Sequence, residues 1–175
     1  RGAGTSRRWC DSGWRGCEVR DRGGQAAAKR KELTMDQLLL GFGVMALSVA
    51  IHLLGGFGLL MAMDKRAGAP GDRFLLRSVW MMVQMFVGLV TLHIAQIVLW
   101  GLLYWWQIDW DLSTALYFST VTYATIGYGD VVPTPDWRLG AAIEGLTGVL
   151  MLGWSSALIF VVVNRLYAAR LKASG

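Results

Sequence analysis

Three long apolar stretches, separated by short polar segments, set the pattern of this chain. The first covers residues 35–63, where Asp36 is the only formally charged residue. The second covers residues 78–106, and the third covers residues 139–166, where Glu144 is the only acid. An α-helix needs about 20 apolar residues to cross the hydrocarbon core of a bilayer, and each stretch is longer than that. The pattern therefore predicts three transmembrane helices.

Basic residues near the ends of these stretches predict their orientation. Residues 64–77 form a loop with four basic residues, and Arg165, Arg170 and Lys172 close the third stretch. Because Lys and Arg accumulate on the cytoplasmic side, both ends are expected inside the cell, and the segment between the second and third helices outside. We expect a multi-pass protein of the plasma or inner membrane. The aromatic residues, interpreted as interface anchors and packing partners, support the same orientation. Trp80 lies near the expected inner side, and six others lie near the expected outer side: Trp100, Tyr104, Trp105, Trp106, Trp110 and Trp137.

Composition supports the same class of protein, since 54% of the residues are hydrophobic and the mean hydropathy is +0.42. The net charge of +5 comes entirely from residues 1–34, which hold nine basic and four acidic residues. That segment shows no periodic pattern and is predicted to be disordered. Met35 is the first methionine, so we expect translation to begin there and the preceding residues not to be native. The alternative is a basic arm that binds anionic lipid or nucleic acid, with Trp9 and Trp14.

Between the second and third stretches lies a segment too short to span the membrane. Residues 111–124 predict a short helix, with several candidate N-caps including Asp111 at its start and two to three helical turns from residue 115 to about residue 123. The sequence Thr125-Ile126-Gly127-Tyr128-Gly129-Asp130 follows it directly. Glycine adopts positive φ without a Cβ penalty, so Gly127 and Gly129 allow a strand in which left- and right-handed conformations alternate. Such a strand turns successive carbonyl groups toward the same side.

This motif, placed between two apolar helices and behind a short helix, resembles the T-[VI]-G-Y-G selectivity filter of the potassium channels. The resemblance covers roughly residues 111–163. In that family four filter strands meet on an axis and present rings of backbone carbonyls to the ion, so the resemblance implies a homotetramer. It places K⁺ ligands at Thr125, Ile126, Gly127 and Tyr128, with Gly129 completing the filter.

Residues behind the filter depart from the family pattern. Val121 stands where many prokaryotic relatives carry a glutamate that hydrogen-bonds behind the filter, and valine cannot replace that bond. Tyr117 resembles a position often held by tryptophan, and its hydroxyl is expected to reach Asp130. Together with Glu144, these three residues are the predicted filter support.

Glu144 lies about five residues into the third helix, or ~8 Å below the outer surface. Low polarity at that depth favours the neutral acid. We expect Glu144 to brace the pore helix or filter through Thr122 or Tyr123, and to make conduction sensitive to pH. The alternative is a solvated carboxylate in an outer crevice.

Further along the third helix, Gly148 falls where the family places its gating hinge, although close helix packing explains a small residue equally well. By the same resemblance Val149, Leu152 and Ser156 line the ion cavity, since their spacing puts them on one helical face. Gly153 is interpreted as a packing residue.

Two histidines are expected to meet within the membrane. His52 and His93 lie about 15 and 13 residues from the outer helix ends, which places both ~20 Å deep. Neutral, hydrogen-bonded packing histidines are the favoured interpretation, because a two-histidine metal site lacks further ligands.

Taken together, the sequence predicts an all-α integral membrane protein with three transmembrane helices and a re-entrant pore helix and filter between the second and third. The predicted function is passive, potassium-selective conduction by a homotetramer in membrane lipid. A weakly selective cation channel and a non-conducting regulatory subunit are the alternatives. We expect no enzymatic activity, no nucleic-acid partner and no cofactor apart from the permeant K⁺, since no nucleophile–base or metal-ligand cluster is visible. Without an arginine ladder, a voltage sensor is not expected.

Overall fold

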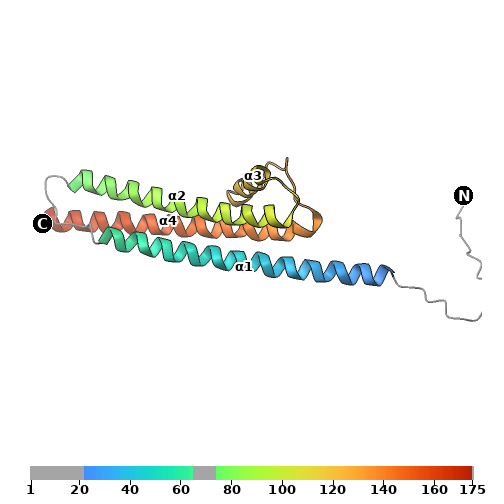
Figure 1. Cartoon of the computed structure of the whole chain (residues 1–175). Coiled ribbons are helices and arrows are strands. Elements are labelled where there is room, and N and C mark those ends of the chain that lie inside the picture. Colours follow the sequence, from blue (N-terminus) through green and yellow to red (C-terminus); the bar gives the residue numbers. More distant parts are fainter. Residues whose placement is uncertain (1–21, 65–73, 175) are drawn as a thin grey trace, which may run out of the picture.

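The computed structural model describes residues 22–64 and 74–174, which form four α-helices and one short 3₁₀ helix and contain no strand. In chain order these are α1 (Arg22–Asp64), α2 (Phe74–Gln107), α3 (Leu112–Tyr123), η1 (Pro135–Trp137) and α4 (Arg138–Ser174). The long helices α1, α2 and α4 contact one another along the bundle, and the short α3 packs against α2 and α4 near one end (Figure 1).

The three apolar helices agree with the prediction. Their membrane-compatible parts are Met35–Met63, Phe74–Gln107 and Pro135–Leu171, each long and apolar enough to cross a bilayer. The boundaries of α2 and α4 extend beyond the predicted 78–106 and 139–166, because helix-forming Leu and Ala residues flank both stretches.

At the start of α1 the prediction was wrong. We expected residues 1–34 to be disordered, yet α1 begins at Arg22. Residues 25–33 are rich in Ala, Lys, Glu and Leu, which are strong helix formers and continue the apolar helix that follows. The rest of that segment, residues 1–21 with Cys10 and Cys17, lies outside the described residues.

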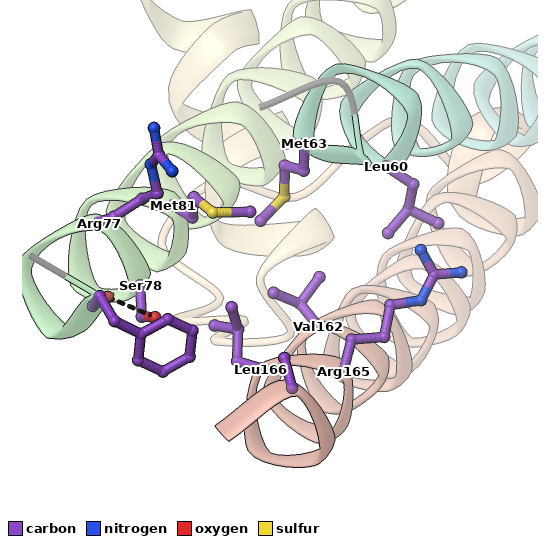
Figure 2. A pocket seen from close by; sticks show the side chains of 10 residues that line it. Leu60, Met63, Arg77, Ser78, Met81, Val162, Arg165 and Leu166 are labelled. Carbon is purple, nitrogen blue, oxygen red and sulfur yellow. Dashed lines mark hydrogen bonds between the residues drawn. The ribbon is translucent and has the colours of Figure 1, made fainter. Parts of the chain in front are cut away.

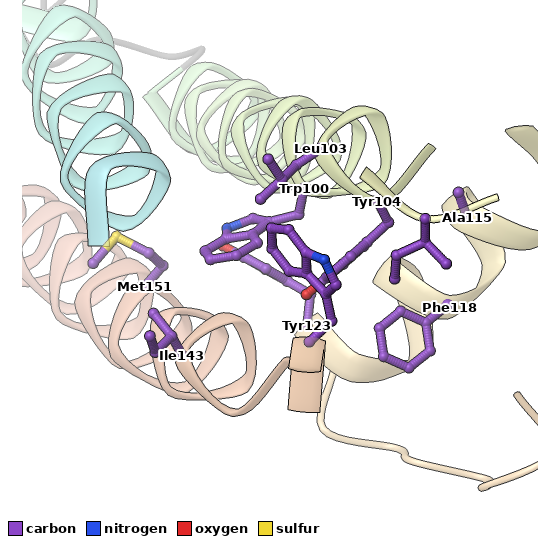
Figure 3. Packing of buried hydrophobic residues seen from close by; sticks show 10 residues of the cluster. Trp100, Leu103, Tyr104, Ala115, Phe118, Tyr123, Ile143 and Met151 are labelled. Carbon is purple, nitrogen blue, oxygen red and sulfur yellow. The ribbon is translucent and has the colours of Figure 1, made fainter. Parts of the chain in front are cut away.

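An aromatic core holds α3 against α2 and α4. Trp100 and Tyr104 of α2 are completely buried, and the Tyr104 ring meets Phe118 of α3 edge-on at a centroid distance of 5.1 Å. Figure 3 shows these side chains facing those of α4. Trp100, Tyr104 and Trp137 therefore act as packing partners and not as interface anchors, whereas Trp105 and Trp106 are exposed.

Glycines bring α1 close to α2 in the middle of the bundle. A Cβ atom on Gly55 would lie 2.4 Å from a methyl group of Leu92, and one on Gly88 would lie 2.5 Å from a methyl group of Leu59. Small residues at helix contacts are typical of membrane proteins, where close packing holds helices together. The first apolar helix is thus an integral part of the bundle.

A second core, built on Met63, Met81 and Val162, closes the end of the bundle away from α3. These residues border a pocket of about 100 Å³, to which α2 contributes Arg77 and α4 contributes Arg165 (Figure 2). Basic side chains from two helices therefore gather at the end opposite to α3.

Candidate functional site

The backbone of the predicted filter alternates in handedness. Thr125, Gly127 and Gly129 have φ values of 60°, 56° and 77°, and no other described residue has a positive φ. Ile126 and Tyr128, which lie between them, have negative φ, so the sign alternates at five consecutive residues. The two glycines behave as predicted. Thr125 is an additional left-handed position, and a β-branched residue adopts that conformation only where its surroundings impose it.

The end of α3 imposes this geometry through the backbone. The carbonyl of Val121 accepts hydrogen bonds from the amides of Ile126 (2.8 Å) and Gly127 (3.1 Å), and that of Thr122 accepts from Thr125 (3.0 Å). Val121 therefore supports the filter with its carbonyl, although its side chain lacks the hydrogen bond of the family's glutamate. Ala124 caps the helix and begins the turn into the filter.

The other end of α3 is fixed by its N-cap. The carboxylate of Asp111 accepts from the Thr114 amide (3.1 Å), from the Thr114 hydroxyl (2.6 Å) and from the Ser113 hydroxyl. These hydrogen bonds, that of Ser113 first, hold the pKa of Asp111 well below its usual range. Of the predicted candidates, Asp111 is the residue that caps the helix.

Outside the filter, the hydrogen bond predicted between Tyr117 and Asp130 is present. The Tyr117 hydroxyl donates to Asp130 Oδ2 at 2.7 Å, and the Val131 amide donates to Asp130 Oδ1 at 3.0 Å. The Tyr117 hydrogen bond is the main cause that lowers the pKa of Asp130 below its ordinary value of 3.8. Asp130 thus stays ionised at neutral pH and ties the residue after the filter to α3.

Glu144 contacts the pore helix, but through different partners from those predicted. Its side chain is fully buried, which contradicts the solvated carboxylate within this chain. Glu144 Oε2 accepts from the Tyr104 hydroxyl at 2.8 Å, and Oε1 lies 2.5 Å from the Ser119 hydroxyl. Thr122 and Tyr123, the predicted partners, are replaced by Ser119, whose side chain lies on the face of α3 that packs against α2 and α4.

Hydrogen counting indicates the protonation state of Glu144. The Ser119 hydroxyl also lies 2.8 Å from the carbonyl oxygen of Ile97. A carbonyl oxygen only accepts and a hydroxyl carries one hydrogen, so Ser119 donates to Ile97. The hydrogen between Ser119 and Glu144 then belongs to Glu144, which is the neutral acid. One carboxyl group in this form links α2, α3 and α4.

Tyr104 and Ser119 are the site residues that sequence reasoning missed. Tyr104 was interpreted only as one of the aromatic interface anchors and packing partners, and Ser119 received no role. The available signal was Glu144 itself, since a buried acid requires polar partners. The short helix α3 carries few polar residues besides Thr122, and Ser119 is one of them. The partners available to Glu144 on that helix were therefore few.

Among the glycines of α4, Gly148 lies closest to α3. A Cβ atom on Gly148 would lie only 2.0 Å from the carbonyl oxygen of Tyr123. The predicted cavity-lining residues Val149, Leu152 and Ser156 are exposed on α4 and make no part of the core of this chain.

The filter also presents apolar side chains that lack cover within the chain. Ile126 is 52% exposed and Tyr128 is 70% exposed. Exposed apolar groups at a site indicate a surface that another molecule covers. Among the described residues no group of three or more His, Cys, Asp or Glu could hold a metal ion.

Two comparisons with known proteins match this chain to ion channels. A family model described as an ion channel matches residues 88–165, from the middle of α2 through the filter into α4. Within 47 residues the chain is 32% identical to the TWiK family of potassium channels protein 18 of Caenorhabditis elegans, a match that covers 27% of this chain and 10% of that protein. No solved structure matches.

The matched region contains every element described above around the filter. It includes the part of α2 that packs against α3, the whole of α3, the alternating backbone and the α4 residues that contact α3. This evidence indicates a channel and not an enzyme, and with the three apolar helices it indicates a multi-pass membrane protein. Residues 88–165 therefore match an ion channel domain, and part of this region is similar to a potassium channel protein.

Proposed function

We propose that this chain is one subunit of a homotetrameric, potassium-selective channel. The observation that carries the proposal is the alternation of φ at Thr125, Gly127 and Gly129, because it turns successive carbonyl groups toward one side. Four such strands around an axis form rings of oxygen atoms that replace the hydration shell of K⁺. The ion is then bound at Thr125, Ile126, Gly127 and Tyr128, and it moves passively down its electrochemical gradient.

The chain supplies one filter strand, so the ring needs other copies. A closed ring of four identical strands implies C4 symmetry. The exposed apolar side chains of Ile126, Tyr128 and Val149 support this proposal, since neighbouring subunits would cover the filter and α4. In the same assembly Val149, Leu152 and Ser156 line the cavity below the filter.

In this assembly α3 acts as a re-entrant pore helix. Its N-cap Asp111 lies at the outer surface, and its C-terminal end, which carries partial negative charge, points toward the cavity and favours a cation there. Tyr117 with Asp130, the carbonyl of Val121, and Glu144 hold the filter from behind.

The orientation follows from the charges at the far end of the bundle. Arg77 and Arg165 border the same pocket at the end opposite to α3. Because basic residues accumulate on the cytoplasmic side, that end faces the cytoplasm and the filter faces outside, in the plasma or inner membrane.

A flux assay tests this function. The purified chain is reconstituted into K⁺-loaded liposomes, and uptake of radioactive Rb⁺, which K⁺ filters accept, is followed with and without Ba²⁺. We expect uptake that Ba²⁺ blocks and that an equal concentration of Na⁺ does not compete away. Protein that inserts into the liposomes and carries no Rb⁺ would overturn the proposal and favour a non-conducting subunit.

A further inference from the structure

Five polar side chains in the middle of the bundle form a closed circuit of hydrogen bonds. They come from all four helices: His52 from α1, His93 and Gln96 from α2, Tyr123 from α3 and Ser155 from α4. The five contacts are Tyr123 Oη to Gln96 Oε1 at 2.8 Å, Gln96 Nε2 to His52 Nδ1 at 2.8 Å, His52 Nε2 to Ser155 Oγ at 3.1 Å, Ser155 Oγ to His93 Nε2 at 2.9 Å, and His93 Nδ1 to Tyr123 Oη at 3.0 Å. We call these residues the histidine ring.

Each member of the histidine ring donates once and accepts once. Tyr123 donates to Gln96, and the Gln96 amide donates to His52 Nδ1, so the hydrogen of His52 lies on Nε2 and points to Ser155. Ser155 then donates to His93 Nε2, and His93 donates from Nδ1 back to Tyr123. Five hydrogens fill five contacts, and both imidazoles are neutral.

The histidine ring joins the first helix to the residue that precedes the filter turn. Tyr123 is the last residue of α3, and the amide of Thr125, two residues later, is bound to the Thr122 carbonyl. Tyr123, Gln96 and His52 are all buried. The position of the Tyr123 side chain, and with it the end of α3, therefore depends on a contact that begins on α1.

We propose that the histidine ring positions the filter end of α3 only while both histidines are neutral, so that binding of a proton to the ring reduces K⁺ conduction. This inference rests on the proposed channel function. It gives the first helix a role in conduction, and it makes His52, His93 and Gln96 positioning residues.

The reason is the hydrogen count. A protonated imidazole carries hydrogens on both nitrogens, so the ring would hold six hydrogens for five contacts. One of the six hydrogens then lacks an acceptor within the ring: either two donors face each other and that contact opens, or the Ser155 hydroxyl accepts from both imidazoles and its own hydrogen loses its partner. Both outcomes leave a buried polar group without its partner in the ring, which is costly in a region of low polarity.

The groups that face the ring offer no charge to compensate. From α1 and α2 the titratable members are the two histidines themselves, 5.0 Å apart between ring centroids, so a charge on one repels a charge on the other. From α3 the titratable member is Tyr123. From α4 the nearest acid is Glu144, which hydrogen-bonds with Tyr104 and Ser119 and is neutral by its own hydrogen count. Nothing among these groups stabilises an imidazolium ion.

The test is Rb⁺ flux through the reconstituted full chain, with the same pH on both sides of the membrane, between about pH 8 and about pH 5. For the parent we expect a fall of about tenfold toward the acid end. Asp130 cannot cause this fall, because its pKa lies below 3.8. The double variant His52→Gln/His93→Gln keeps hydrogen-bonding groups but cannot bind the proton, and its flux should change by less than about twofold.

Thr91→Ala is the matched control, since Thr91 is an exposed residue two positions from His93 whose hydroxyl donates to the Val87 carbonyl of its own helix. It should reproduce the acid inhibition of the parent. A parent whose flux is constant across this range, or a double variant with the parental pH profile, would overturn the inference.

Positioning is tested with His52→Leu, which removes both hydrogen bonds of His52. At about pH 8 it should lower Rb⁺ flux and increase Na⁺ permeation, and His52→Gln should recover part of the flux. Parental flux and selectivity in His52→Leu would contradict the positioning role. If His52→Leu does not fold, the pH profile of the parent still decides. A parent with no flux at about pH 8 would instead overturn the channel function itself.

Discussion

A Cβ atom on Gly148 would lie 2.0 Å from the carbonyl oxygen of Tyr123, much closer than Cβ atoms in proteins approach a non-bonded atom. At this point the backbone of α4 touches the backbone at the end of α3. The sequence left two interpretations of Gly148 open, a gating hinge and close helix packing. The contact supports close packing, and the hinge remains a prediction.

The first prediction follows from this contact. Gly148→Ala should displace the end of α3 and reduce K⁺ flux by about tenfold or more, because overpacking of a backbone contact costs roughly 1–3 kcal/mol. Gly153→Ala, five residues further along α4, is the control, since a Cβ there meets nothing within 4 Å. Liposome flux and thermal stability of both variants provide the measurement. Equal flux in the two variants would contradict the packing role.

The second prediction concerns the filter glycines. Gly127→Ala or Gly129→Ala places a Cβ at a φ of 56° or 77°, where a residue with a side chain loses roughly 1–2 kcal/mol. Because a Cβ at either position meets no atom of its own chain within 4 Å, this backbone cost acts alone in the subunit and is repeated in each copy. The variants should insert normally and lose K⁺ selectivity.

Gly58→Ala is the control for these variants, since Gly58 lies in α1 and its Cβ would also meet nothing within 4 Å. Ratios of Rb⁺ to Na⁺ flux measure the effect. An unchanged ratio in both filter variants would remove the filter assignment.

Features with a local cause were predictable from the sequence. The apolar stretches predicted three helices, Asp111 was among the predicted caps, and the positive φ of Gly127 and Gly129 followed from the absence of a side chain. The hydrogen bond between Tyr117 and Asp130 came from the family resemblance.

Features that depend on how helices rotate against each other were not predictable. Glu144 was expected to brace α3, but its partners Tyr104 and Ser119 lie 40 and 25 residues away, and spacing along one helix does not say which face of another helix it meets. The burial of Trp100 could not be predicted either, because it too depends on which face of α2 packs against the other helices. The meeting of the two histidines was predicted from depth alone, whereas the hydrogen bonds that connect them to Tyr123 were not.

The third prediction concerns Glu144. Glu144→Gln keeps a group that both accepts and donates, and should retain most of the flux. Glu144→Ala leaves the hydroxyls of Tyr104 and Ser119 buried without this partner, at a cost of roughly 1–3 kcal/mol, and should lower flux about tenfold or more. Flux is measured between about pH 5 and about pH 8. If Glu144→Ala matches the parent throughout that range, Glu144 does not brace the pore helix.

The fourth prediction concerns the N-terminal segment. Leu38, Val44 and Val49 of α1 pack against the core beside α3, and all lie after Met35. A chain that starts at Met35 should therefore assemble and conduct like the longer chain. Size-exclusion chromatography in detergent and Rb⁺ flux measure the two properties. Loss of either one would mean that residues 1–34 contribute to the channel.

Selectivity is the central claim, and the reversal potential tests it most directly. Purified protein is incorporated into a planar lipid bilayer with KCl on one side and an equal concentration of NaCl on the other. Because only rings of carbonyl oxygens matched to K⁺ separate the two ions, we predict a current that reverses far from zero, toward the K⁺ equilibrium potential, and that Ba²⁺ blocks. A current that reverses near zero would contradict the account and identify a weakly selective cation channel.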